Sequence, residues 1–323
     1  MKQQFQALHK ELRLGEIAYQ FYYKPTARLR FYQSRGTWNV LSAQIGERAL
    51  KKKLESFPAP QYDAVDVDIS FLTGEKYWHQ TLLCALSLVH NIKQIPSFTI
   101  YSDGTLNAER IQLLKRFFPD LIIVDKKTAE DKVNDRFPRS NYPALRQARD
   151  HFILMKKLLD IPLISPHAMY LDSDMIFWGY PAELLELYQA QSPFYMKEQD
   201  IPDSYGLICD TPIIEEKTGI KPIPHFNSGM FHIGNADIDW PLIESWCSKL
   251  LSIPEQHSPS MLEQTLFCLI FTCIQNAQDL SDSYYVAFDK LPTKSVLTHY
   301  VNSMKFKYMN TEQYRWFHEF KAA

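Results

Sequence analysis

The chain has 323 residues, of which 46% are apolar and 22% charged, with a formal net charge of −2. This composition is typical of globular proteins and excludes collagen-like, low-complexity and disordered chains. The longest strongly apolar stretch, residues 266–274, is much shorter than the roughly 20 residues needed to cross a bilayer. The first residues also lack the apolar core of a secretory signal. We therefore expect a cytoplasmic protein of one or two domains.

Cysteine usage agrees with a reducing compartment. The five cysteines are scattered among apolar neighbours, and no Cys-x-x-Cys pair occurs. A disulfide framework or a zinc ribbon is therefore not expected. We predict five reduced thiols that act as small core residues.

The charge is unevenly distributed along the chain. Residues 1–60 contain eleven Lys and Arg against four Glu, a net charge of +7 that leaves −9 for the rest. This aromatic-rich stretch could bind an anionic membrane or an anionic acceptor, or it could be a helical extension whose aromatics pack on the main domain. Nucleic acid is not an expected partner, because no nucleic-acid-reading motif accompanies the charge. We divide the chain into an extension, 1–60, and a main domain, 61–323.

From about residue 63 the sequence alternates between the two periods of secondary structure. Apolar residues recur with period two in the expected strands and at helical spacing in the expected helices. Asn107 is a helix-capping residue type at the start of the second helix. In chain order we expect a strand at 65–71, a helix at 77–91, a strand at 97–101, a helix from 108 to about 118, a strand at 121–124, a helix from about 144 to 159, a loop at 161–167 and a strand at 168–171. This order predicts an α/β fold with a mostly parallel sheet and helices on both faces.

Ligands of such sheets bind at the carboxyl ends of the strands, where this chain places two acids. Asp172, Ser173 and Asp174 follow the strand at 168–171 and form an Asp-x-Asp motif. Carboxylates are the ligands that Mg²⁺ and Mn²⁺ prefer, and a cation would relieve their mutual repulsion. Phosphatases of the haloacid dehalogenase type also use Asp-x-Asp. That pattern lies near the start of their domain, whereas here at least three strand–helix units precede it and Met175 follows it.

Three further motifs follow in order: Phe-Asn-Ser-Gly at 226–229, Glu-Gln at 263–264, and a His299 to Lys305 segment. With the Asp-x-Asp motif they resemble the family-8 retaining glycosyltransferases of the GT-A fold, over residues 63 to 305. Two positions depart from the family pattern: Glu263 stands in place of Asp, and Asn302 in place of Gly. Asn tolerates a positive φ better than most residues, so the turn at 302 is expected to survive.

The resemblance implies a donor site for a nucleotide diphosphate sugar, most simply a UDP-sugar. Asp172, Asp174 and His299 would hold Mn²⁺ or Mg²⁺, and Lys305 would pair with the diphosphate. Ser173 and Gly229 belong to the same donor-binding motifs.

The resemblance also implies roles for side chains around the sugar and the base. Catalytic contacts to the sugar are predicted for Asn227, Glu263 and Gln264, although Glu263 could equally form a capping box with Ser260. A basic residue of the helix before the Asp-x-Asp strand would reach the donor sugar. For that helix we select Lys156 in preference to Lys157. For the base pocket we select Thr73 and Asp103. Asp103 could equally belong to an Asp-Gly turn that binds no ligand. Arg149, on the same helix as Lys156, is expected on a solvated face of that helix.

These roles predict metal-dependent transfer of a hexose, with retention, to a glycan, a lipid-linked or a protein acceptor. The alternative is a catalytically silent module that binds nucleotide sugars or glycans, because function resides in sites and not in folds. A cytoplasmic location at the inner membrane face would suit the basic extension. The tail after residue 306 is expected to be a helix that packs on the domain or closes over the donor.

Overall fold

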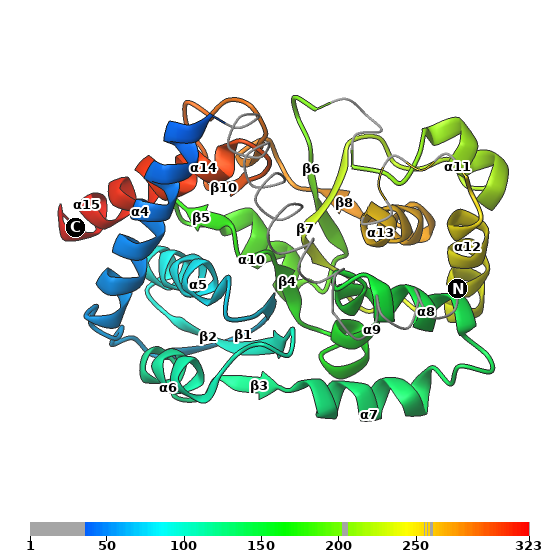
Figure 1. Ribbon diagram of the computed structural model, residues 1–323, viewed down its shortest axis with the longest axis horizontal. Coiled ribbons are helices and arrows are strands. Elements are labelled where there is room, and N and C mark those ends of the chain that lie inside the picture. The colour runs from blue at the N-terminus through cyan, green and yellow to red at the C-terminus, as the bar shows by residue number, and fades with distance from the viewer. Residues whose placement is uncertain (1–35, 202–205, 255, 257, 259–260, 323) are drawn as a thin grey trace, which may run out of the picture.

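The computed structural model describes residues 36–322, apart from 202–205, 255, 257 and 259–260 (Figure 1). The helices are α4 (Thr37–Glu55), α5 (Trp78–Ile92), α6 (Ala108–Phe117), α7 (Lys126–Arg136), α8 (Pro143–His151), α9 (Met155–Ile164), α10 (Ala182–Gln189), α11 (Thr211–Thr218), α12 (Trp240–Leu251), α13 (Leu262–Cys273), α14 (Met304–Lys307), the π-helix η3 (Tyr308–Glu312) and α15 (Gln313–Ala322). The strands are β1 (Ala64–Thr73), β2 (Ile95–Ser102), β3 (Ile122–Val124), β4 (Met169–Leu171), β5 (Met175–Phe177), β6 (Phe194–Lys197), β7 (Phe226–His232), β8 (Gln278–Asp279), β9 (Tyr284–Ala287) and β10 (Leu297–Tyr300).

The central sheet of the described chain has the strand order β3-β2-β1-β4-β7-β6-β8. β1 pairs in parallel with both β2 and β4, and β2 pairs in parallel with β3. β7 lies antiparallel to its neighbours β4 and β6. The predicted mostly parallel α/β sheet is therefore confirmed.

A second, three-stranded sheet has the order β5-β10-β9. β10 runs antiparallel to β5 and parallel to β9, with His299 opposite Met175. The residues Asp172, Ser173 and Asp174 form the turn between β4 of the large sheet and β5 of the small one. The Asp-x-Asp motif therefore lies at the joint between the two sheets.

Two apolar clusters cover the two faces of the large sheet. Alternate residues of β1, such as Ile69 and Phe71, pack with α5 and the small sheet, because side chains of a strand point to opposite faces. Tyr170 of β4 points the other way and packs with α8, α9, α12 and α13. This helix-on-sheet layering leaves the strand ends open for the site. Figure 1 shows α4, α14 and α15 at one end of the molecule and α11 to α13 at the other.

The end of the predicted extension is a helix that packs on the domain. One face of α4 is buried and contacts η3, α14 and α5. Trp38, an aromatic residue of this helix, is nevertheless exposed to solvent. The predicted boundary at residue 60 thus follows a helix that already packs on the main domain, and residues 1–35 lie outside the described residues. The tail prediction is confirmed, because Trp316 and Phe317 of α15 are buried.

The prediction of one helix from about 144 to 159 is wrong, because the chain forms two helices there, α8 and α9. The chain leaves α8 with Phe152 in an extended conformation and starts α9 at Met155. Arg149 Nε then lies 2.6 Å from Asp160 Oδ1. Residues eleven apart on a straight helix would be separated by about 16 Å, so this ion pair requires the break. α9 also continues to Ile164 through Pro162, where a loop was expected.

Two smaller expectations are also corrected. The helix α7 was not predicted, since Ala129 and Val133 are its only buried side chains and its apolar period is weak. Four of the cysteines are buried as expected, but Cys273 is exposed. All five are free thiols. Among the described residues no helix is long and apolar enough to span a membrane.

Candidate active site

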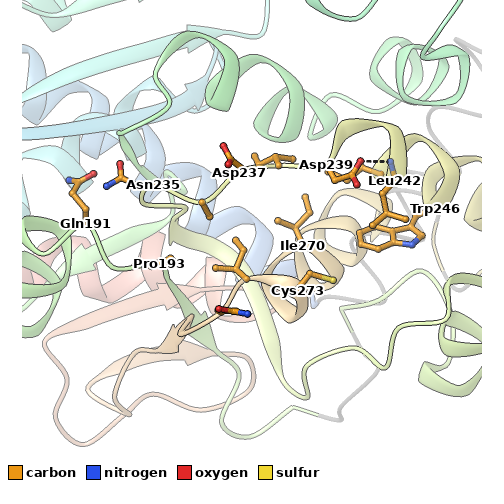
Figure 2. A pocket seen from close by; sticks show the side chains of 14 residues that line it. Gln191, Pro193, Asn235, Asp237, Asp239, Leu242, Trp246, Ile270 and Cys273 are labelled. Atoms are coloured by element: carbon orange, nitrogen blue, oxygen red, sulfur yellow. Dashed lines mark hydrogen bonds between the residues drawn. The ribbon is translucent and has the colours of Figure 1, made fainter.

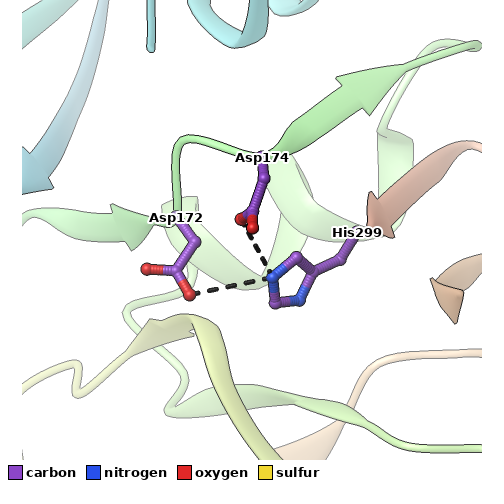
Figure 3. A group of neighbouring side chains, drawn as sticks. All are labelled: Asp172, Asp174 and His299. Carbon is purple, nitrogen blue, oxygen red and sulfur yellow. Dashed lines mark ion pairs between the residues drawn. The ribbon is translucent and has the colours of Figure 1, made fainter. Parts of the chain in front are cut away.

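The metal-ligand candidates of the sequence converge at the joint between the sheets. Asp172, Asp174 and His299 each place a ligand atom within 4.8 Å of the others (Figure 3). His299 Nε2 lies 3.2 Å from Asp174 Oδ1 and 3.8 Å from Asp172 Oδ2. Figure 3 shows the imidazole of β10 pointing at both carboxylates of the β4–β5 turn. Two carboxylate oxygens and one imidazole nitrogen form a ligand set that suits Mn²⁺ or Mg²⁺.

Cations already surround Asp174. Lys305 Nζ lies 2.6 Å from Asp174 Oδ2. Burial favours the neutral acid, but the charges of Lys305 and His299 outweigh burial and hold the pKa of Asp174 well below its ordinary value. The Asp174 carboxylate in turn raises the pKa of Lys305. Asp174 is therefore ionised at every physiological pH, as a metal ligand must be.

Gly229 of β7 gives the histidine its space. A Cβ atom at Gly229 would collide with the His299 ring, at Cε1 and Nδ1. The carbonyl oxygen of Gly229 also accepts a hydrogen bond of 2.7 Å from the backbone N–H of Asp172. The Phe-Asn-Ser-Gly motif and the Asp-x-Asp motif are therefore in direct contact.

A buried lysine links the acids of the site. Lys157 Nζ lies 3.4 Å from Asp172 Oδ1 and 3.2 Å from Glu263 Oε1. Burial disfavours the Lys157 ammonium, but these two carboxylates outweigh it and raise its pKa. Burial raises the pKa of Glu263 to about 7, although Lys157 opposes the shift. Glu263 is thus a carboxyl group that can change protonation near neutral pH.

The structure brings Lys157, and not Lys156, to the Asp-x-Asp motif. Lys156 Nζ instead donates a hydrogen bond of 3.3 Å to the Ser102 carbonyl oxygen. Lys156 and Asp103 line a charged cavity of about 240 Å³ whose lining includes none of the three metal-ligand candidates. The two residues predicted for the donor are thus together, but they lie apart from the metal-ligand cluster. Arg149 lines the same cavity and is buried against Asp160, so its prediction as a solvated residue is wrong.

Hydrogen bonds hold the two predicted amide side chains, buried ones at Asn227 and a partly buried one at Gln264. Asn227 Nδ2 donates to Glu198 Oε1 at 2.9 Å, and Asn227 Oδ1 accepts from the Gly229 N–H at 2.9 Å. Gln264 Nε2 donates to the Phe226 carbonyl oxygen at 3.1 Å. Sequence reasoning did not identify Glu198, a buried carboxyl directly after β6, because nothing in the Phe-Tyr-Met-Lys-Glu segment distinguishes it from a surface acid.

Neighbouring hydroxyl groups connect the first strand to the motif. Thr81 Oγ1 lies 2.8 Å from both Thr73 Oγ1 and Ser173 Oγ. Two predicted donor-site residues are therefore joined through Thr81, a residue of α5 that the sequence analysis did not select. Because a hydroxyl both donates and accepts, this chain can fix the orientation of the Asp-x-Asp turn.

Two local predictions concern the departures from the family pattern. Asn302 has a φ of 46°, so the expected left-handed turn is confirmed. The capping box predicted for Glu263 involves Ser260, which lies outside the described residues. The Glu263 side chain faces Lys157 and accepts a hydrogen bond from Ser228 Oγ at 3.4 Å.

A cavity of about 390 Å³ lies far from these residues in the fold, at the loop that follows β7. Figure 2 shows it between that loop, α12 and α13, with Trp246 and Ile270 among its lining residues. It contains none of the predicted site residues. The chemistry-bearing residues are therefore concentrated at the sheet joint and not in this cavity.

Two carboxylates and a histidine thus converge at the strand ends of this α/β sheet, with Lys157 and Lys305 beside them. The sequence model described as glycosyl transferase family 8 matches residues 68–308, and the chain belongs to this family. It is accordingly a glycosyltransferase with the GT-A fold that the resemblance predicted.

Solved structures of similar fold include several glycosyltransferases. The chain is similar to mouse xyloside xylosyltransferase 1, with 12% identity, 73% of this chain and 97% of that chain covered, and a TM-score of 0.48. It is similar to the galactosyltransferase LgtC in complex with donor and acceptor sugar analogues, with 12% identity, coverage of 77% and 99%, and a TM-score of 0.45. It is also similar to the bifunctional glycosyltransferase WbbM, with 12% identity and a TM-score of 0.46. That comparison covers 81% of this chain and 52% of WbbM. No curated protein matches the chain in sequence.

Proposed function

We propose that this glycosyltransferase is metal-dependent and transfers a hexose from a UDP-sugar, with retention, to a glycan, a lipid-linked or a protein acceptor. The convergence of Asp172, Asp174 and His299 on one point, with Lys305 beside them, carries the proposal. The resemblance to family 8 adds the donor class and the retaining outcome. The anomeric carbon would exchange its bond to the diphosphate oxygen for one to an acceptor hydroxyl oxygen.

The three ligand residues would hold Mn²⁺ or Mg²⁺, and the ion would stabilise the negative charge of the departing diphosphate. The side chains around the ion have tasks of their own. Lys305 is half exposed and can turn from Asp174 to a phosphate oxygen, since ammonium groups bind phosphate as point charges. Gly229 keeps the imidazole of His299 in place, so the ligand geometry is set before the donor arrives.

The buried side of the site would face the sugar. Lys157 is fixed between Asp172 and Glu263, and it couples the metal-ligand cluster to the Glu-Gln motif. Asn227 and Gln264 belong to the same connected group through Ser228 and Gly229. We assign the sugar contacts to this group, and the base or ribose contacts to Thr73 and to the cavity of Asp103 and Lys156.

Donor hydrolysis across a panel of nucleotide sugars tests the proposal. The expected result is slow cleavage of one UDP-sugar that requires Mn²⁺ or Mg²⁺ and stops with chelator. Equal cleavage with chelator would overturn the metal requirement, and cleavage of a donor with another base would overturn the UDP assignment. Metal-dependent UDP binding without turnover on any donor, even with added glycan acceptors, would support the silent binding module instead.

We also propose a cytoplasmic location at the inner face of a membrane, where a lipid-linked or cell-surface glycan would be assembled. The net charge of +7 on residues 1–60 supports it, because basic segments are attracted to anionic lipid surfaces. Cell fractionation tests this part: recovery of the protein with membranes, reversed by high salt, is expected. Recovery in the soluble fraction alone, at low salt, would contradict it.

A further inference from the structure

An exposed apolar stripe runs along the first half of α4. Trp38, Leu41 and Ile45 are spaced three and four residues apart, so they lie on one face of the helix. Their exposed fractions are 79%, 42% and 65%. A single exposed apolar residue needs no explanation, but an aligned set on one helix face indicates a contact surface.

Two cations continue the same face toward the end of the helix. Arg48 and Lys52 follow Ile45 at spacings of three and four residues, and both are exposed. In the part of the chain that the structure describes, neither forms an ion pair or a hydrogen bond. The basic charge of this face is therefore available to an external partner.

The opposite face of α4 fixes the orientation of the stripe. Val40, Ala43, Gly46, Leu50 and Leu54 are buried against the domain. Asn310 Nδ2 donates to Ser42 Oγ at 2.9 Å, and Gln313 Nε2 donates to the Gly46 carbonyl oxygen at 2.8 Å. The helix is thus firmly held, and its outer face must point away from the domain (Figure 1).

We propose that the α4 stripe, defined as Trp38, Leu41, Ile45, Arg48 and Lys52, is a docking surface for an anionic lipid bilayer. The inference rests on the membrane location proposed above and identifies the surface that makes the contact. Tryptophan prefers the membrane interface, and Leu and Ile side chains enter the boundary between headgroups and acyl chains. Arg48 and Lys52 would reach anionic headgroups while their stems cover apolar surface.

A bilayer fits this surface better than a second copy of the chain does. A stable protein interface uses about 20–30 residues on each side, whereas the stripe offers five. Arg48 and Lys52 of the stripe have no ion-pair partner among the described residues, which favours an anionic partner. The position matters for function, because α4 contacts α14, and α14 carries Lys305 of the candidate active site. Docking through α4 would hold the site close to lipid-linked acceptors.

Vesicle co-sedimentation of the full chain tests the proposal, without donor or acceptor. We expect binding to phosphatidylcholine vesicles that contain phosphatidylglycerol and much weaker binding to phosphatidylcholine alone. Trp38→Ser together with Ile45→Ser should weaken binding at least about tenfold, since each buried apolar side chain contributes more than that factor. Arg48→Gln and Lys52→Gln should each weaken binding about fivefold. The matched control is Ile122→Ser, which removes an apolar side chain of 57% exposure on β3.

Three outcomes would overturn the proposal. Unchanged binding by the stripe variants would assign the contact to residues 1–35. Equal losses in the Ile122→Ser control would indicate a nonspecific effect of surface polarity. A concentration-dependent dimer that the stripe variants abolish, without vesicle binding, would assign the stripe to a second copy. Hydrolysis of a soluble donor by the same variants is expected to stay unchanged, so failure of the docking surface and failure of the proposed transferase function are distinguishable.

Discussion

Two groups of charges include residues of α9, and they differ in how their charges are balanced. Asp160 of α9 belongs to the first, in which Arg149 binds Asp160 through two nitrogens and Glu130 through a third. Lys157 of α9 belongs to the second, which contains Asp172 and Glu263. Both groups contain buried charges, so burial of charge does not by itself mark a functional site.

What distinguishes the candidate site is how the charges of each group are paired. In the first group, every guanidinium nitrogen of Arg149 meets a carboxylate oxygen of Asp160 or Glu130, and Arg146 makes one further contact to Glu130. The second group is joined through Asp172 to the metal-ligand cluster, in which the carboxylates of Asp172 and Asp174 converge on the imidazole of His299. In the part of the chain that the structure describes, His299 Nδ1 has no hydrogen-bond partner. A closed network stabilises the fold or is neutral to it, whereas converging carboxylates gain from an added cation.

Breaking the closed network should have the largest effect on stability. Arg149→Met leaves Asp160 buried without its cation, and a loss of about 3–5 kcal/mol in the free energy of unfolding is expected. Urea denaturation measures it. The double variant Arg149→Met/Asp160→Leu removes both charges and should recover most of the loss. A cost below about 1 kcal/mol for the single variant would mean that the pair behaves as a surface salt bridge.

Opening the second group should affect turnover more than folding. Asp174→Asn keeps the shape but removes a charged ligand, so metal-dependent donor cleavage should fall about 10²–10³-fold, because the stabilisation by a metal is worth several kcal/mol. Steady-state donor hydrolysis measures the loss, and circular dichroism checks the fold. Asp279→Asn is the matched control, since Asp279 forms an ion pair with Lys197 away from the site. Full activity of Asp174→Asn would remove this residue from the metal site.

The contact between Gly229 and His299 permits a finer test of the same group. Gly229→Ala should displace the imidazole without removing any ligand and should weaken Mn²⁺ affinity about 10–100-fold, as is typical when the groups that orient metal ligands are changed. Mn²⁺ titration of activity measures it. At Gly179 an added Cβ would meet Val296 only at ordinary van der Waals distance, so Gly179→Ala should leave the affinity unchanged. Equal affinities in the two variants would contradict the role of Gly229.

The smallest expected effect on stability comes from His79, a buried histidine of α5. Burial lowers the pKa of His79 from 6.5 to about 3, and Lys51 and Arg110 add to the shift. His79 is therefore neutral in the folded state but takes up a proton on unfolding below pH 6.5, so stability is lost as pH falls from 6.5 toward 3. His79→Leu should remove about 1 kcal/mol of this loss between about pH 6 and pH 5. Unfolding measured at both pH values tests it; parallel losses in the two proteins would contradict it.

The end of a buried strand predicted the place of Asp172 and Asp174, and the resemblance to family 8 added His299 as their third partner. The preference for Lys156 over Lys157 shows what the sequence could not predict, because Lys157 is the lysine that contacts Asp172 and Glu263. It assumed one continuous helix, and the break after α8 changes the direction in which each α9 residue points. Glu198 and Thr81 carry no motif at all. Their proximity to the site depends on strand pairing and helix packing, which local patterns do not encode.

The joint between the two sheets has a consequence for how an ion would act on the whole molecule. Asp172 directly follows β4 of the large sheet and Asp174 directly precedes β5 of the small one, while His299 lies in β10, 125 residues after Asp174 along the chain. An ion bound by all three would cross-link the two sheets and close a long loop. It would then stabilise the folded state by mass action, about 2.7 kcal/mol at a concentration one hundred times its Kd. Metal binding could therefore be followed by a rise in melting temperature, with no sugar present.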